Sequence, residues 1–126
     1  MELKIFENGI QSHNQVIHRA LLKNGLYVMH EKGYSYTVGM KNIGSPDLIL
    51  FGQSSEIADE MFRVIFQAVQ MGLLILDQVK SIDHIFEPQP QLKHFSDMEK
   101  RRHFFAARTY YGSWDFNVLN VSMDFH

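Results

Sequence analysis

Cysteine is absent from the 126-residue sequence. This absence excludes disulfides, thiol catalysis, thiolate metal sites and iron–sulfur clusters, and it agrees with a reducing compartment. Long apolar runs are also missing, because the longest, MGLLIL at 71–76, is far shorter than the roughly 20 residues that span a bilayer. The opening stretch MELKIFENGIQSHN has no basic segment followed by an apolar run, so it does not indicate a secretory signal. We therefore expect a cytoplasmic protein with no membrane partner.

A strong excess of charge of one sign is lacking as well. The formal net charge is −2, so electrostatics give no general argument for binding nucleic acid or an anionic membrane. Apolar residues make up 45% of the chain and charged residues 21%, which is the balance of a soluble globular domain. The length predicts a single domain over residues 1–126, large enough to bury a core without metals or disulfides.

The common motifs of metal, nucleophilic and phosphate chemistry do not occur. There is no HExxH or HxH pair, and His13 and His18 are five residues apart, which fits one helical face poorly. No GxSxG elbow is present, and the glycine spacing matches neither a P-loop nor a dinucleotide fingerprint. We expect no metal and no cofactor. A catalytic set that assembles only in space would leave no motif, so the catalytic residues are unknown and enzymatic activity stays open, although a non-catalytic protein is favoured.

Helical and extended patterns alternate along the chain. The class is therefore predicted as α+β, with a mainly antiparallel sheet and about three helices packed mostly on one face. The predicted elements are a weak strand in 1–7 before a turn at Asn8-Gly9, a helix from Ser12 to Gly25, strands at 26–30, 33–40 and 47–52, a helix from Ser54 or Ser55 to Gly72, extended stretches at 73–76 and 79–86, a loop at 88–90, a helix from Ser96 to about Tyr110, and a strand at 116–123.

The octet GYSYTVGM at 33–40 gives the clearest strand signal, because large and small side chains alternate in it. Its large side chains should share one face, which we predict to lie in the core: Tyr34, Tyr36, Val38 and Met40. Its small side chains should share the other face, which either seats a helix or binds a ligand: Ser35, Thr37 and Gly39. The seating of a helix is the more common use of such a face.

A ligand pocket between sheet and helix would draw its hydroxyl, carboxyl and amide groups from the octet and the neighbouring strands. The candidate ligand-binding residues are Ser35, Tyr36, Thr37, Asp47 and Asn120.

A basic run on the predicted helix after Ser96 is the candidate surface for a partner. Solvated helix faces often look like this, but arginines beside aromatic residues can also bind an acidic protein or stack on nucleic acid bases. On the same helix, Phe105 follows helical spacing with Met98, Arg102 and Thr109, and this stripe is expected to face the core. The candidate partner-binding residues are Lys100, Arg101, Arg102, His103 and Arg108.

Several stretches of the chain resemble a bacterial family of small domains of unknown function, numbered four-two-six-two. The family pattern is a helix ending in glycine, an aromatic strand, an aromatic-Tyr-Thr-x-Gly stretch, a Gly-x-Pro-acidic-Leu strand and a glycine before a helix. The corresponding stretches here are 25–28, 34–40, 44–48 and Gly52, followed near the C-terminus by Tyr111-Gly112, 118–120 and Met123-Asp124. Asn120 stands where the family often has glutamine, and the tryptophan of its C-terminal motif is missing. The resemblance covers about residues 13–124 and implies the fold; it carries no established activity.

Two hypotheses about function follow. The first is a non-catalytic protein-binding module, with a toxin-neutralising immunity protein as its concrete form, because such proteins cover a partner through shape and charge complementarity. The second is a small-ligand-binding protein or enzyme that uses the pocket near Thr37. Nucleic acid is a less favoured partner, and the oligomeric state is open.

Overall fold

Alternation in the octet does build a strand, and that strand lies second in a five-stranded sheet. The computed structural model describes residues 2–82, 86 and 89–123, with side chains from residue 13 onward. Its helices and strands are α1 (Glu2–Asn24), β1 (Tyr27–Glu31), β2 (Tyr34–Val38), the 3-10 helix η1 (Met40–Ile43), β3 (Asp47–Phe51), α2 (Ser55–Gln70), the 3-10 helix η2 (Leu76–Gln78), β4 (Gln91–His94), α3 (Asp97–His103), α4 (Phe105–Tyr111) and β5 (Val118–Ser122).

The sheet has the strand order β1-β2-β3-β5-β4. Neighbouring strands are antiparallel except for β3 and β5, which are parallel. Strands β1 and β2 form a hairpin, with Glu31 opposite Tyr34 and a turn at Lys32-Gly33 in which Gly33 has a φ of 90°. This two-residue connection favours a glycine at positive φ, and it fixes the register of the pair. The mainly antiparallel α+β prediction is confirmed.

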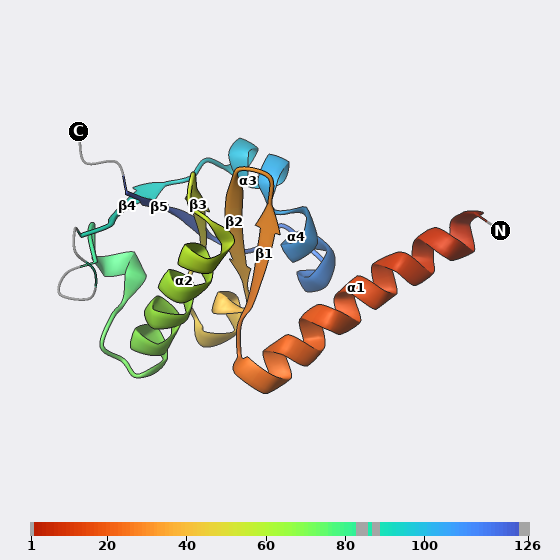
Figure 1. Cartoon of the computed structure of the whole chain (residues 1–126), viewed down its shortest axis with the longest axis horizontal. Coiled ribbons are helices and arrows are strands. Elements are labelled where there is room, and N and C mark those ends of the chain that lie inside the picture. The colour runs from red at the N-terminus through yellow and green to blue at the C-terminus, as the bar shows by residue number, and fades with distance from the viewer. Residues whose placement is uncertain (1, 83–85, 87–88, 124–126) are drawn as a thin grey trace.

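Helices cover both faces of the sheet: α2 lies on one face, and α1 and α4 lie on the other (Figure 1). Helix α2 packs over one face and closes a core around Leu48, Leu50 and Phe62. Helices α1 and α4, with α3 beside them, cover the other face around Tyr36 and Ile49. The prediction that helices lie mostly on one face is confirmed, with four helices in place of about three.

Both faces of the octet strand are therefore buried. Tyr36 and Val38 lie in the core under α1 and α4, as predicted for the large face, and Ser35 and Thr37 are buried on the side of α2. Met40 departs from the prediction because β2 ends at Val38, and the chain turns into η1, which carries Met40 into the α2 core. The small face thus seats a helix.

Four local predictions are wrong. The weak strand at 1–7 and the turn at Asn8-Gly9 are replaced by α1, which runs through both to Asn24, because one glycine weakens a helix by only about 1 kcal/mol and does not end it. The predicted helix start at Ser12 therefore lies inside α1. The helix after Ser96 divides at Phe104, whose buried ring packs 4.4 Å from that of Tyr36, between centroids, and holds φ −104° and ψ 41°.

The segment after α2 also differs from the prediction. No strand forms in the described part of 73–86, where η2 and one isolated bridge, from Ser81 to Gln91, occur instead. Strand β4 begins at Gln91 directly after the predicted loop, in a stretch where no strand was predicted. Residues 83–85 of the predicted extended stretch, Pro88 of the loop and Asp124 of the C-terminal motif lie outside the described residues.

Candidate functional site

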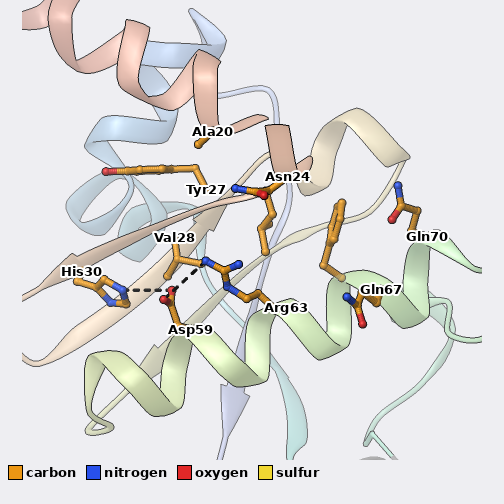
Figure 2. Close-up of a pocket in the computed structure, with 11 residues that line it drawn as sticks. Ala20, Asn24, Tyr27, Val28, His30, Asp59, Arg63, Gln67 and Gln70 are labelled. Carbon is orange, nitrogen blue, oxygen red and sulfur yellow. Dashed lines mark ion pairs between the residues drawn. The ribbon is translucent and has the colours of Figure 1, made fainter. Parts of the chain in front are cut away.

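A groove opens at the β1 edge of the sheet, between the C-terminal end of α1 and the side of α2 (Figure 2). Its volume is about 400 Å³. Apolar side chains form part of the wall, and side chains that can form hydrogen bonds converge on the opening. The lining residues are Ala20, Asn24, Leu26, Tyr27, Val28, His30, Asp59, Arg63, Phe66, Gln67 and Gln70.

Helix α2 supplies a polar stripe to this groove. Asp59, Arg63, Gln67 and Gln70 follow one another at spacings of four, four and three residues, which places them along one side of the helix. The adjacent side of α2 is apolar and buried against the sheet, and Ser54 caps the helix by accepting a hydrogen bond from the backbone N–H of Ile57 at 3.2 Å. The stripe is thus held at the border between core and solvent.

His30 is the most constrained polar side chain of the groove. Its Nδ1 lies 2.8 Å from the Ser35 hydroxyl, and its Nε2 lies 3.3 Å from Oδ1 of Asp59. A carboxylate only accepts hydrogen bonds, so the proton of a neutral imidazole belongs on Nε2, and Nδ1 accepts from the Ser35 hydroxyl. The ring therefore has no unengaged lone pair that faces the groove. Because Ser35 is only 4% exposed, this Ser, His and Asp set orients the ring and does not present a nucleophile.

Arg63 is the more available charge. Its guanidinium contacts Oδ2 of Asp59 at 3.9 Å, a long distance for an ion pair, and its side chain is 60% exposed. Figure 2 shows it reaching from α2 toward β1 beside Val28. A guanidinium has five N–H donors, so most of its hydrogen-bonding capacity is directed to the open groove.

The backbone of β1 is the other unused feature of the groove. Strand β1 is the terminal strand of the sheet, and none of the described residues pairs with its outer edge. At the opposite edge, by contrast, β4 is covered: the N–H of Leu92 donates to Lys80 and the N–H of Ile82 donates to Pro90. In an antiparallel pair every second residue directs its N–H and C=O away from the partner strand, so β1 offers hydrogen-bonding groups along the groove.

A second polar set surrounds a buried carboxyl, where β2 ends and β3 begins. The Thr37 hydroxyl donates to Oδ1 of Asp47 at 2.8 Å and accepts from the N–H of Leu48 at 2.9 Å. The Tyr111 hydroxyl donates to Oδ2 of the same carboxyl at 2.7 Å and accepts from the N–H of Gly39, also at 2.7 Å. A further N–H, that of Met40, donates to Oδ1 at 3.1 Å. The set joins β2, β3 and α4.

Burial dominates the electrostatics of this interior set. It raises the pKa of Asp47 to about 7, against the opposing effect of the hydrogen bonds from Tyr111, Thr37 and Met40. The pKa of Tyr111 is raised by its burial first and then by the charge of Asp47. The carboxyl is therefore poised to change its protonation near neutral pH, although it is fully buried.

The sequence-predicted ligand residues do not gather in one pocket. Thr37 and Asp47 do meet, through a hydrogen bond, but both are 0% exposed. Ser35 is turned to His30, and the Tyr36 hydroxyl accepts from the N–H of Ala106 at 3.1 Å. Asn120 lies opposite Ile49, on the other face of the sheet from Thr37, beside a shallow hollow lined partly by Phe51 and Met123.

The basic run is partly tied into the fold. Lys100 donates to the carbonyls of Trp114 and Phe116 at 2.9 and 2.8 Å, and its side chain is only 12% exposed. His103 packs its ring against Tyr34, with the centroids 4.9 Å apart. Of the remaining candidates, Arg101 and Arg102 are exposed and pair with carboxylates of α3 itself, and Arg108 is half-buried on α4.

The prediction that the stripe through Met98 and Phe105 faces the core is wrong. Met98 is 63% exposed and Phe105 is 66% exposed. The division of the helix at Phe104 explains this: Phe104 enters the core in their place, and α4 continues from it with Ala106 and Ala107 as its buried residues. The exposed pair lies beside Arg101 and Arg102 on the same short helices.

Sequence reasoning missed the groove. The stripe from Asp59 to Gln70 has hydrogen-bonding residues at helical spacing in the sequence, but no site was predicted from it. His30 gave no signal, because its partners Ser35 and Asp59 are set by the sheet register and by the position of α2.

Comparison with known proteins places the chain in a family. The family described as Domain of unknown function (DUF4262) matches residues 20–124. The chain belongs to this family. The DUF4262 match includes all five strands, the groove residues from Ala20 to Gln70 and the interior set around Asp47, and it confirms the resemblance noted in the sequence. No curated protein and no solved structure matches the chain.

No helix among residues 2–82, 86 and 89–123 is long and apolar enough to cross a membrane. Within the same part of the chain, no three His, Asp or Glu side chains gather where they could hold a metal ion.

Proposed function

We propose that the chain is a protein-binding module that takes up an extended segment of a partner as an additional strand beside β1. The observation that carries the proposal is the uncovered outer edge of β1 at the opening of a groove with hydrogen-bonding walls. Addition of a strand uses main-chain hydrogen bonds for affinity and lining side chains for specificity.

The dimensions of the groove fit such a segment. The five residues of β1 extend over about 17 Å at roughly 3.4 Å per residue. The α2 stripe from Asp59 to Gln70 extends over about 16 Å at roughly 1.5 Å per residue. Both sides of the groove can therefore contact a segment of about five residues along its whole length.

The lining chemistry also favours a peptide. The amide side chains of Asn24, Gln67 and Gln70 each offer donors and an acceptor, the combination that a peptide backbone requires. They lie on α1 and α2, the two walls that flank β1 in Figure 2. Toxins are one class of partner, since a bacterial immunity protein covers its toxin through complementary shape and charge, and the exposed Arg101 and Arg102 with Phe105 would extend the contact.

The absence of cysteine from the sequence provides a direct test. Gln70→Cys introduces one thiol into the groove, and Gln91→Cys introduces one beside the opposite, covered edge as a matched control. Each variant is equilibrated, under mild reduction, with five-residue peptides of alternating valine and threonine that carry a disulfide to a small thiol. The cysteine thiolate then exchanges with that disulfide, and the small thiol is released. We expect more disulfide conjugate at Gln70→Cys by mass spectrometry, and slower hydrogen exchange at alternate amides of β1. Equal conjugation at both positions, or unchanged exchange in β1, would reject strand addition.

The toxin version has its own test. Expression of the chain should rescue cells that produce a toxin encoded beside it, and Phe105→Ser with Arg101→Glu should weaken the rescue if the α3 surface contributes. Failure to rescue cells from the product of any adjacent gene would remove the toxin version and leave strand addition to be judged separately.

A small ligand in the same groove is the second candidate function. A volume of about 400 Å³ is within the usual range of ligand pockets. The groove also borders the octet, since Val28 pairs with Thr37 in the sheet. A compound that raises the melting temperature without slowing exchange in β1, and that no longer acts on Arg63→Gln, would favour this candidate over strand addition.

A further inference from the structure

Charged groups in the groove are not equally available to a bound segment. Asp59 is shared between His30 at 3.3 Å and Arg63 at 3.9 Å, and both nitrogens of His30 are already engaged, by Ser35 and Asp59. Arg63 makes one long contact and keeps a side chain that is 60% exposed. Among the groove residues, the guanidinium of Arg63 is thus the charged donor with capacity left for a partner.

We infer that the segment bound beside β1 carries an acidic side chain opposite Val28, where its carboxylate meets the guanidinium of Arg63. This inference rests on the proposed strand addition and names the kind of segment that the groove selects. Arginine suits the task because its planar fork of donors matches a carboxylate with two parallel hydrogen bonds.

Figure 2 fixes the position of the acidic residue within the segment. Arg63 reaches toward β1 near the middle of the groove, with His30 and Asp59 on one side of it and the amides of Gln67 and Gln70 on the other. An extended segment places alternate side chains on the same face. The acidic side chain is therefore central in a five-residue segment, with polar groups favoured toward Gln70.

Asp59 moderates this preference. Its carboxylate lies beside the guanidinium and repels a second carboxylate. Removal of its charge by Asp59→Asn should strengthen the selection of an acidic segment. A purely structural role of Arg63 predicts no such increase.

The tethering experiment tests the inference with three peptides that differ only at the central residue, which is glutamate, glutamine or lysine. On Gln70→Cys we expect roughly three- to tenfold more conjugate with glutamate than with glutamine, because a charged hydrogen bond at a partly exposed site exceeds a neutral one by about that factor. Lysine should give the least. The preference should fall with added salt.

Second-site variants decide the cause. Arg63→Gln should abolish the preference for glutamate, Arg63→Lys should keep part of it, and Asp59→Asn should increase it. Equal conjugation of all three peptides on Gln70→Cys, or a preference that persists in Arg63→Gln, would overturn the acidic-segment inference while strand addition stands. If no peptide conjugates above the Gln91→Cys control, strand addition itself fails, and the inference fails with it.

Discussion

Thr37→Val removes one oxygen from the interior and leaves the shape of the side chain almost unchanged. The lost hydroxyl is a donor to Asp47 at 2.8 Å and an acceptor from the N–H of Leu48 at 2.9 Å. Thr37, Asp47 and Leu48 are each 0% exposed, so water cannot replace either hydrogen bond without entering the core. The variant therefore leaves the buried N–H of Leu48 without an acceptor. It also removes one of the three hydrogen-bond donors to the buried carboxyl of Asp47.

The expected cost is about 2–4 kcal/mol, because a buried group left without its partner costs about 1–3 kcal/mol and a charged one costs more. A 126-residue chain loses roughly 4 °C of melting temperature per kcal/mol. The melting temperature should thus fall by about 8–16 °C, measured by circular dichroism together with urea unfolding.

Thr37→Ser is the matched control, since it keeps the hydroxyl and deletes only a methyl group. It should cost about 1 kcal/mol, the usual effect of one buried methyl group. If Thr37→Val is no less stable than Thr37→Ser, the hydroxyl does not support the interior set, and the role assigned to Thr37 is refuted.

Three further variants probe the same interior. Burial raises the pKa of Asp47 from 3.8 to about 7, so its contribution to stability is complete below about pH 4 and is lost as the pH rises through 7. Relative to Asp47→Asn, the native chain should lose up to about 4 kcal/mol of unfolding free energy between pH 4 and pH 8. Urea unfolding at each pH would show this loss. Tyr111→Phe removes a donor to Asp47 and the acceptor for the N–H of Gly39, and should cost about 2–3 kcal/mol in urea unfolding, whereas no loss would mean that the two hydrogen bonds are replaced. Gly39→Ala should destabilise the fold by several kcal/mol in thermal unfolding, because the φ of 116° at this position is strained for alanine and a Cβ would lie 2.5 Å from Cδ2 of Leu21. A melting temperature within about 2 °C of the native value would contradict the close packing.

Local chemistry in the sequence predicted the elements whose signals act over a few residues. Alternation predicted the octet strand, and the predicted helix starts at Ser54 and Ser96 are residues that cap α2 and α3 by accepting from the N–H groups three residues on. The strand predicted at 47–52 is β3, which is buried from Asp47 to Leu50. These features depend on neighbours in the chain, so a single sequence contains them.

Features decided by distant residues were not predictable in this way. Phe104 divides the last helical segment because a pocket beside Tyr36, far earlier in the chain, takes its ring. The third donor to Asp47 could not be predicted for the same reason, since Tyr111 lies 64 residues from Asp47 in the sequence. The groove depends on how α1, β1 and α2 meet, so helical spacing alone could place only the four stripe residues of α2 on one side of a helix and showed none of the groove's geometry.

The interior set and the groove are mechanically connected through Gly39. Its N–H is held by Tyr111, which is held in turn by Asp47, and its Cα side faces Leu21 and the carbonyl of Gly25 at the end of α1. The close approach allowed by glycine at position 39 sets where α1 ends against the sheet, and that end carries Asn24 into the groove wall. The buried carboxyl, which no partner can reach, thus helps to fix the width of the groove that a partner would enter.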